Sequence, residues 1–282
     1  MNEERIVWFN GMLMPDDEVA LSPFDLGVAN GLGVFETLMA YEGSTPTFDR
    51  HYERLKTSAA VMDLAVPVAA ELADAIQGVI KANELEGERA RVRITLGTGS
   101  RPMQSSDDSC DIQDYIFITA VPQPERTDIA ELILVPMRCN ERSATSGLKS
   151  TSYANYLLAY RHARKEGADE AVMMNTMGQL CECSMANLFV VKDGCVFTPP
   201  LSSGCLPGVT RGLVMELCQR EGIPVEEVEL TEDVLFISEE IFITSSGREV
   251  QAAKMVDTSL TGPGPITQRL ADAYRGIITQ SA

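Results

Sequence analysis

Hydrophobic and polar residues recur with two different periods along the chain, and these periods predict a protein of mixed strands and helices. Residues 90–97 (ARVRITLG) alternate with a period of two, as a half-buried strand does. In 50–63 the apolar residues fall on one helical face, and Asp49 is the expected N-cap of that helix. Further strands are predicted at 4–13 (a hairpin around Asn10-Gly11), 33–41, 114–121, 130–137, 169–174, 186–192, 195–198, 225–230, 239–244 and 249–255. Further helices are predicted at 69–84, 152–166, 209–221 and 265–279, with a helical turn near 231–236.

A break in this pattern divides the chain. The segment that begins at Val121 (VPQPERTD) has two prolines and several charges, which is typical of a linker. We predict an α+β fold with a smaller N-terminal domain (1–121), a linker (122–128) and a larger C-terminal domain (129–282) that carries Lys149. A chain of 282 residues is long enough for two hydrophobic cores of this size.

Composition and charge narrow the functional classes. The net charge of −18 disfavours nucleic acid and anionic membranes as partners. The apolar runs are too short to span a bilayer, and the N-terminal residues lack the pattern of a signal peptide, so we expect a cytoplasmic protein. Seven cysteines without framework spacing indicate reduced thiols rather than disulfides.

Several common sites are disfavoured by the motifs. With only His51 and His162, a His-rich metal site or a Ser-His-Asp triad is not expected. The glycine pairs lack the third glycine of a dinucleotide fingerprint, and no Walker A sequence occurs. Cys181-x-Cys183 has no second pair at finger spacing, so we expect packed thiols and no metal. Ser146-x-x-Lys149 fits the first motif of serine acyl enzymes without its companion motifs, which leaves such a hydrolase as a distant alternative.

The stretch from Gly147 to Arg211 combines three features with a common use. Lys149 has no neighbouring charge, Glu182 precedes an apolar strand pattern, and Gly208 to Thr210 open a helical pattern as in an anion-binding helix N-terminus. Each feature alone also fits a solvated lysine, a surface carboxylate or an ordinary helix start. Together they provide the amine, the carboxylate and the phosphate cradle that a pyridoxal phosphate (PLP) enzyme needs.

The motifs in and around this stretch carry a family resemblance. They are GLGVFETL (31–38), FDRHYERL (48–55), NERSATSGLKSTSYANYLLA (140–159), GADEAVMMNTMGQLCECSMANLFVVKDG (167–194), FTPPLSSGCLPGVTR (197–211) and ITSSGREV (243–250). In these segments the chain resembles the class IV (fold type IV) PLP-dependent aminotransferases. That family includes branched-chain and D-amino acid aminotransferases and 4-amino-4-deoxychorismate lyases.

The resemblance implies a two-domain fold with PLP between the domains, a homodimer, and roles for individual residues. Lys149 would bind PLP as a Schiff base and carry the proton between the substrate α-carbon and the cofactor. Glu182 would face the ring nitrogen and keep it protonated. Contacts with the cofactor are thereby expected at Arg54, Lys149, Tyr153, Glu182, Val209, Thr210 and Ser246, where Arg54, the two helix N–H groups and Ser246 would bind the phosphate.

The substrate region departs from two branches of the family. Branched-chain enzymes have a tyrosine two residues before an arginine where this chain has Arg91-Val92-Arg93. D-Amino acid enzymes have R-x-H where this chain has Arg101-Pro102-Met103, and GTGSR (97–101) is closer to the lyase branch. The expected substrate contacts are Phe35, Arg93, Arg101 and Gly247, with Arg101 preferred for the carboxylate.

The predicted activity is therefore the transfer of an amino group between an amino acid and a 2-oxo acid. The alternative is a lyase that releases pyruvate and 4-aminobenzoate from aminodeoxychorismate.

Overall fold

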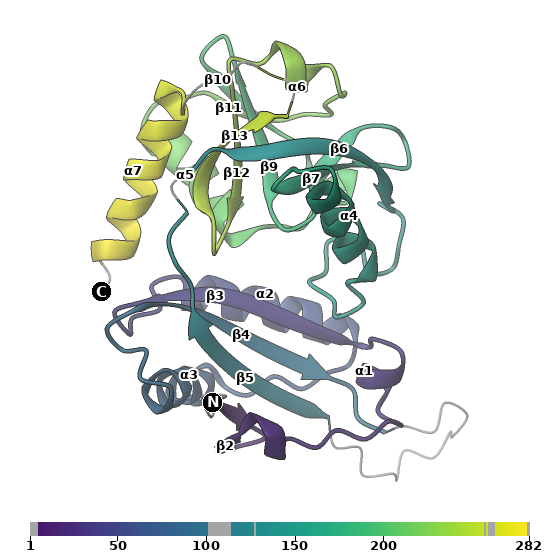
Figure 1. The fold of residues 1–282 in the computed structure, drawn as a ribbon, viewed down its shortest axis with the longest axis vertical. Coiled ribbons are helices and arrows are strands. Elements are labelled where there is room, and N and C mark those ends of the chain that lie inside the picture. Colours follow the sequence, from purple (N-terminus) through teal and green to yellow (C-terminus); the bar gives the residue numbers. More distant parts are fainter. Residues whose placement is uncertain (1–4, 101–113, 127, 257, 259–262, 281–282) are drawn as a thin grey trace. The chain divides into compact units, whose positions relative to one another are not determined.

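The first alternating segments form a five-stranded antiparallel sheet (Figure 1). Its strands are β1 (Ile6–Phe9), β2 (Met12–Pro15), β3 (Gly33–Tyr41), β4 (Arg89–Gly97) and β5 (Tyr115–Pro122), in the order β2-β1-β5-β4-β3. The computed structural model describes residues 5–100, 114–126, 128–256, 258 and 263–280. The β1–β2 hairpin turns at Asn10 and Gly11, which both have positive φ, so the predicted hairpin is confirmed.

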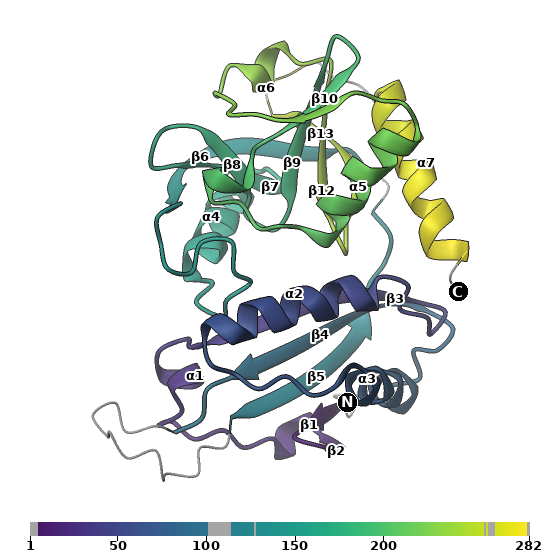
Figure 2. The same ribbon diagram turned by 180° about the vertical axis from the view of Figure 1, so that it is seen from behind.

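Two long helices cover one face of this sheet, and the sequence period explains which face. They are α2 (Phe48–Val61) and α3 (Ala69–Ala82), and the short helix α1 (Leu26–Ala29) precedes β3. Even-numbered positions of β4 (Ala90, Val92, Ile94 and Leu96) enter a core shared with both long helices, which cross the sheet in Figure 2. The odd-numbered arginines of β4 therefore lie on the opposite face, as the alternation predicts.

A distant segment continues the edge of this sheet. The Phe35 N–H donates to the Lys149 carbonyl oxygen and the Thr151 N–H donates to the Gly33 carbonyl oxygen, each at 2.8 Å. Val34 and Ser150 form an antiparallel bridge between the two segments. A Cβ atom on Gly33 would lie 2.5 Å from the Leu96 carbonyl oxygen, so only glycine fits at this crowded edge.

A second unit holds an eight-stranded mixed sheet. Its order is β11-β10-β9-β12-β13-β6-β7-β8, with β6 parallel to both β13 and β7. The strands are β6 (Ala130–Cys139), β7 (Glu170–Asn175), β8 (Leu180–Cys183), β9 (Asn187–Lys192), β10 (Cys195–Thr198), β11 (Val225–Glu227), β12 (Glu240–Ser245) and β13 (Glu249–Met255). β7, β8 and most of β9 are buried, so they read as apolar runs rather than as alternation.

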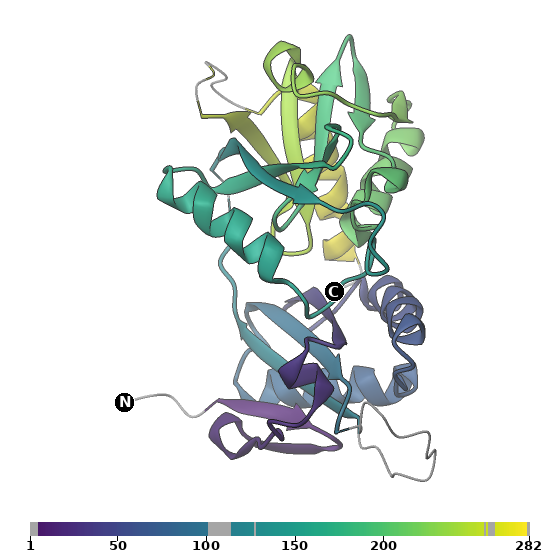
Figure 3. The same ribbon diagram turned by 90° about the vertical axis from the view of Figure 1, so that its right-hand side faces the viewer.

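Helices border this sheet on different sides, as Figure 3 shows for α4 and α5. They are α4 (Ala154–Lys165), α5 (Val209–Arg220), α6 (Val234–Ile237) and α7 (Pro265–Gln280). α4 packs on β6 and β7, and α5 and α7 pack on each other and on β12. Short 3-10 turns lie at Asp16–Glu18 and Leu201–Ser203. The α+β fold predicted from the sequence is confirmed.

The grouping of residues into units adds one finding about the chain path. The first unit comprises 1–124 together with Leu148–Tyr153, and the second comprises 125–147 and 154–280. Lys149 thus packs with the first sheet, although the segments on both sides of 148–153 belong to the second unit. The predicted domain limits around 122–128 stay a prediction.

Two local expectations need correction. Helix α2 begins at Phe48, and its N-cap is Thr47 rather than Asp49, which lies in the first turn. Strand β8 was not among the predicted strands. It has four residues and pairs with β7 across an irregular register, so it is too short to show a period.

Candidate active site

Lys149 lies beside an aromatic ring in the first unit. Its Nζ is 4.5 Å from the ring centroid of Phe35, on the neighbouring strand β3. The Tyr153 ring meets Phe35 edge-on, with centroids 5.4 Å apart and an interplanar angle of 86°. The backbone hydrogen bonds between this segment and β3 fix Lys149 next to Phe35. The structure therefore brings together three of the predicted residues around one ring.

Arg93 stacks on the same phenylalanine. Its guanidinium carbon is 3.7 Å from the Phe35 ring centroid, and its Nε donates to Thr95 Oγ1 at 3.2 Å. Burial, followed by the charge of Arg91, lowers the pKa of Arg93 from its usual value. Within the described part of the chain, no carboxylate forms an ion pair with Arg93, so its charge is available for an anion.

Arg54 is held from behind by a fully buried carboxylate. Its Nε donates to Glu36 Oε1 at 2.8 Å and its Nη2 donates to Glu36 Oε2 at 2.7 Å, in bidentate geometry. Burial alone would raise the pKa of Glu36, but the Arg54 guanidinium and hydrogen bonds from Arg54 and His51 lower it to about 2. Burial lowers the pKa of His51, so its ring is neutral at pH 7. Because the ionised Glu36 can only accept, the His51 Nδ1–H donates to Glu36 Oε2, 2.7 Å away.

In the second unit, Glu182 projects from β8 and is almost completely buried, with 4% of its surface exposed. The Tyr156 hydroxyl donates to its Oε1 at 3.0 Å and the Leu206 N–H donates to its Oε2 at 3.1 Å. Burial and the charge of Glu182 raise the pKa of Tyr156, which keeps the phenol protonated and able to donate. Two donors from separate segments therefore orient a buried carboxylate.

Asn187 connects this carboxylate with the start of α5. Its Nδ2 lies 3.4 Å from Glu182 Oε2 and donates to the Leu206 carbonyl oxygen at 2.9 Å. A Cβ atom on Gly208 would lie 2.0 Å from Asn187 Oδ1, so the N-cap of α5 must be glycine for the helix to start here. Val209 and Thr210 are the first residues of that helix and are buried. Asn187 also faces Thr244 across β9 and β12.

The turn after β12 holds the remaining predicted contacts. Ser246 and Gly247 are half-buried residues of the turn between β12 and β13. The Arg248 N–H closes this turn by donating to Ser245 Oγ at 3.2 Å. Just before the turn, Thr244 Oγ1 is buried and has no hydrogen-bond partner within the described residues.

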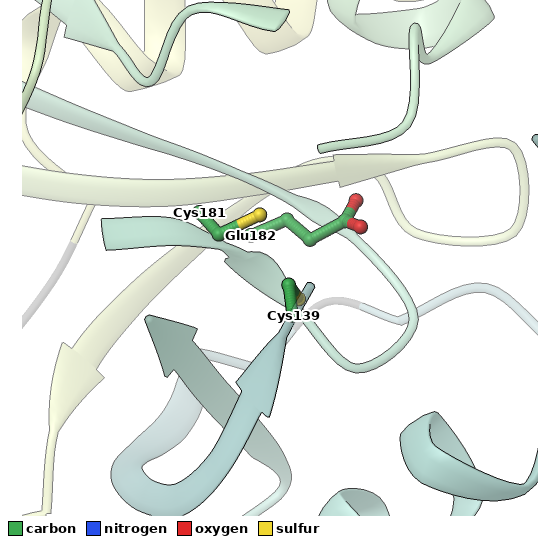
Figure 4. A group of neighbouring side chains, drawn as sticks. All are labelled: Cys139, Cys181 and Glu182. Atoms are coloured by element: carbon green, nitrogen blue, oxygen red, sulfur yellow. The ribbon is translucent and has the colours of Figure 1, made fainter. Parts of the chain in front are cut away.

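Two thiols lie next to Glu182 (Figure 4). Cys139 is the last residue of β6, and Cys181 precedes Glu182 in β8. The two Sγ atoms and a Glu182 carboxylate oxygen all lie within 4.8 Å of one another. The Cys139 thiol also donates to the Tyr156 hydroxyl at 3.9 Å. A hydrogen bond with Cys139, together with burial, raises the pKa of Cys181.

The predicted site residues thus form two groups, one within each unit. Lys149, Phe35, Arg93 and Tyr153 share the first group, and Arg54 lies in the same unit on α2. Glu182 and the start of α5 share the second group, and Ser246 and Gly247 lie in the same unit. Arg101 lies outside the described residues.

Sequence reasoning missed Tyr156 and Asn187. An asparagine that opens a buried apolar strand was the available signal for Asn187. Tyr156 had no such signal, because its role depends on which side of α4 meets β8.

Comparisons with known proteins bear on both groups. A family model described as "Amino-transferase class IV" matches residues 33–256. Among curated proteins, the chain is 28% identical over 281 residues to a D-alanine aminotransferase of Bacillus licheniformis, and the alignment covers 96% of each chain.

Solved structures give the same result. A branched-chain aminotransferase from the archaeon Thermoproteus uzoniensis, solved with norvaline, is 32% identical; the likeness covers 99% of this chain and 96% of that one, with a TM-score of 0.87. A branched-chain amino acid aminotransferase from T.th., complexed with N-(5'-phosphopyridoxyl)-L-glutamate, is 27% identical with the same coverage and a TM-score of 0.88.

Proposed function

The chain belongs to the class IV aminotransferases, and from that premise we propose that Lys149 and Glu182 are the residues that carry its reaction. The protein is a PLP-dependent enzyme that transfers an amino group between an amino acid and a 2-oxo acid. The comparisons favour this activity over the lyase and hydrolase alternatives, since the relatives are aminotransferases. The observation that carries our assignment is the buried, doubly hydrogen-bonded carboxylate of Glu182.

The donors and acceptors of the second unit fit PLP. A buried carboxylate suits a protonated ring nitrogen, because charge attraction is strong where water is excluded. The N-terminus of α5, with Gly208 as its cap, suits a phosphate. The buried Thr244 hydroxyl lies at the end of the strand that leads to Ser246, and it has a donor to offer. When bound, PLP supplies the electron sink that stabilises negative charge on the substrate α-carbon.

Lys149 has two tasks in this proposal. Its Nζ holds the cofactor covalently and, once released, moves the proton at the α-carbon. The Phe35 ring 4.5 Å from Nζ keeps one side of the amine free of water and in contact with an aromatic face. Tyr153 stays the proposed partner of the ring hydroxyl, and its edge-on contact with Phe35 restricts its ring.

Arg54 is the proposed phosphate ligand of the first unit. An arginine that already binds Glu36 through Nε and Nη2 keeps a fixed guanidinium plane. His51 secures the same carboxylate from one helical turn earlier. The arrangement pre-orients the guanidinium, so less entropy is lost when a phosphate binds. The proposed contacts of Val209, Thr210 and Ser246 complete this set.

Arg93 and Arg101 are the proposed ligands of the substrate carboxylate. Arg101 is the choice that the family resemblance favours, and Arg93 is the one whose surroundings the structure describes. Arg93 is desolvated, stacked on Phe35 and not paired with a carboxylate within the described residues, which suits an anion in a protein of net charge −18. Phe35 and the backbone N–H of Gly247 remain the other proposed substrate contacts.

Two coarser properties complete the proposal. We propose a homodimer, on the basis of the family resemblance. A cytoplasmic location is supported by the six described cysteines, which are all free thiols. No helix among the described residues is both long and apolar enough to cross a membrane.

The replacement Lys149→Ala tests the central assignment. The variant should remain folded and lose nearly all transfer between amino acids and 2-oxo acids, together with the absorbance of covalently held PLP, because alanine has no amine to replace Nζ. Turnover is measured with a panel of L- and D-amino acids, which also identifies the preferred donor. Borohydride reduction followed by peptide mapping should label Lys149 in the parent protein. A label on a different lysine would disprove the assignment.

A further inference from the structure

We propose that Cys139, Cys181 and Glu182 form a binding site for a thiophilic divalent metal ion of the zinc and cadmium class, and that the ion switches the enzyme off by taking the Glu182 carboxylate. The binding site stands on geometry alone. The inhibition rests on the proposed function of Glu182.

The three ligand atoms already lie close to a metal-binding arrangement. Both Sγ atoms and a Glu182 oxygen are within 4.8 Å of one another, and Figure 4 shows the side chains gathered at the ends of β6 and β8. With zinc–sulfur bonds of about 2.3 Å, two tetrahedral sulfur ligands lie about 3.8 Å apart. The side chains therefore need to approach one another by no more than about 1 Å, which rotation about the side-chain bonds provides.

The chemistry of the set selects the ion. Two thiols and one carboxylate favour zinc or cadmium over magnesium or calcium, because the hard cations prefer all-oxygen sites. When the ion binds, two S–H bonds break, two metal–sulfur bonds form and two protons pass to solvent. The Tyr156 hydroxyl, 3.0 Å from Glu182 Oε1 and 3.9 Å from Cys139 Sγ, is the neighbouring polar group that can complete the coordination.

The site is buried and distinct from the other thiols. Cys139, Cys181 and Glu182 are 3%, 1% and 4% exposed. Cys183 is exposed to the same 1% and lies in the same strand, but it packs into a different core cluster from Cys139 and Cys181. Among the described residues, no other group of three ligands was found with this spacing. Cys183 is therefore a matched control.

Occupation of the site would change what Glu182 contacts. A metal-bound oxygen of Glu182 has its charge neutralised by the ion, so it no longer stabilises a protonated ring nitrogen. The hydrogen bonds that Tyr156 and the Leu206 N–H donate to this carboxylate would also weaken. The ion thereby inhibits without touching Lys149 or any residue of the first unit.

Titration of the dialysed holoenzyme with Cd²⁺ tests the proposal. We expect one ion per chain, an ultraviolet sulfur-to-cadmium charge-transfer band, and at least a tenfold loss of turnover that a chelator reverses. Mg²⁺ at the same concentration should produce neither effect. Cys139→Ala and Cys181→Ala should each lose the band and the inhibition, measured relative to the metal-free rate of the same variant. Cys183→Ala should keep both.

Further variants keep the test decisive. Serine at positions 139 and 181 should give the same loss as alanine, because a hydroxyl is a poor ligand for these ions. Glu182→Gln should keep the charge-transfer band but bind Cd²⁺ at least tenfold more weakly. An unchanged band in the Cys139 and Cys181 variants, or an unchanged affinity in Glu182→Gln, would overturn the site. Absence of amino transfer by the metal-free enzyme would instead count against the proposed function, whatever the metal data show.

Discussion

At the scale of single residues, Glu182 shows how burial and hydrogen bonding act together. A carboxylate with 4% exposure costs several kcal/mol to keep ionised unless donors surround it. The Tyr156 hydroxyl and the Leu206 N–H supply such donors, and Asn187 ties the same region to the start of α5. The local structure thus keeps a charge in a place where water cannot screen it.

Removal of the Tyr156 hydroxyl should weaken this arrangement. In Tyr156→Phe we expect turnover to fall by about tenfold, since one hydrogen bond to a charged group contributes about 1.5–3 kcal/mol. The pH dependence of turnover should also shift, because Glu182 loses one of the donors that favour its ionised form. Steady-state rates across pH measure both effects. Tyr160→Phe, in the same helix, is the control and should change neither.

Arg93 allows a sharper test of substrate binding. Arg93→Lys keeps the charge but loses the planar fork, so we expect KM for the amino donor to rise at least tenfold, about 1.4 kcal/mol. The absorbance of the bound cofactor should stay unchanged. Arg91 lies two residues away on the same face of β4 and is exposed, so Arg91→Lys is the matched control. An equal KM in both variants would leave Arg101 as the carboxylate ligand.

At the scale of elements, the sequence predicted what periodicity can report. The long strands β3 and β4 and the helices α3 and α5 appear within two residues of their expected limits, because each offers several turns or pleats of a regular pattern. β8 escaped because four buried residues carry no period, and α1 because it is a single turn. Thr47 displaced Asp49 as the cap because helix α2 includes Phe48, which packs against the core of the first unit.

Strand β3 and helix α2 are joined by the Glu36–Arg54 pair, which should make stability depend on pH. The pKa of Glu36 is about 2 in the folded protein, below its ordinary value of 4.5. Its contribution is therefore fully present above pH 4.5 and is lost as the pH falls toward 2. The difference in unfolding free energy between the parent and Glu36→Gln should shrink by about 3 kcal/mol over that range.

Denaturant unfolding at several pH values measures this difference. Glu53→Gln serves as the control, because Glu53 is an exposed residue of the same helix that pairs with Lys56 at the surface. We expect its difference from the parent to stay near zero throughout. A gap for Glu36→Gln that stays constant across this acidic range would contradict the assignment.

At the scale of the whole molecule, the sequence indicated the family but not the grouping of its parts. The motifs around Lys149 and Glu182 identified both residues, since their neighbours are specific. Their supporting groups depend on tertiary contacts: Tyr156 reaches Glu182 from a helix 26 positions earlier, and Glu36 meets Arg54 across 18 positions. No local pattern encodes such pairs, so only the folded structure reveals them.

The oligomeric state is the prediction that belongs to this scale. We expect sedimentation equilibrium or light scattering to give twice the 30.7 kDa mass of the chain, independent of dilution through the micromolar range. Truly obligate pairing would also make the thermal midpoint depend on protein concentration. A mass equal to one chain at all concentrations would show that the protein acts as a monomer.

The path of the chain at Lys149 has a consequence for biosynthesis. Residues Leu148–Tyr153 complete the edge of a sheet whose other strands all lie before residue 125, so the edge is finished by residues made more than a hundred positions after Gly33. Ribosomes add about 5–20 residues per second, so the β3 edge stays open for several seconds during translation. Until then, its exposed backbone groups are a surface on which another nascent chain can pair. The segment that brings the reactive amine into place is thus also the segment that closes the edge.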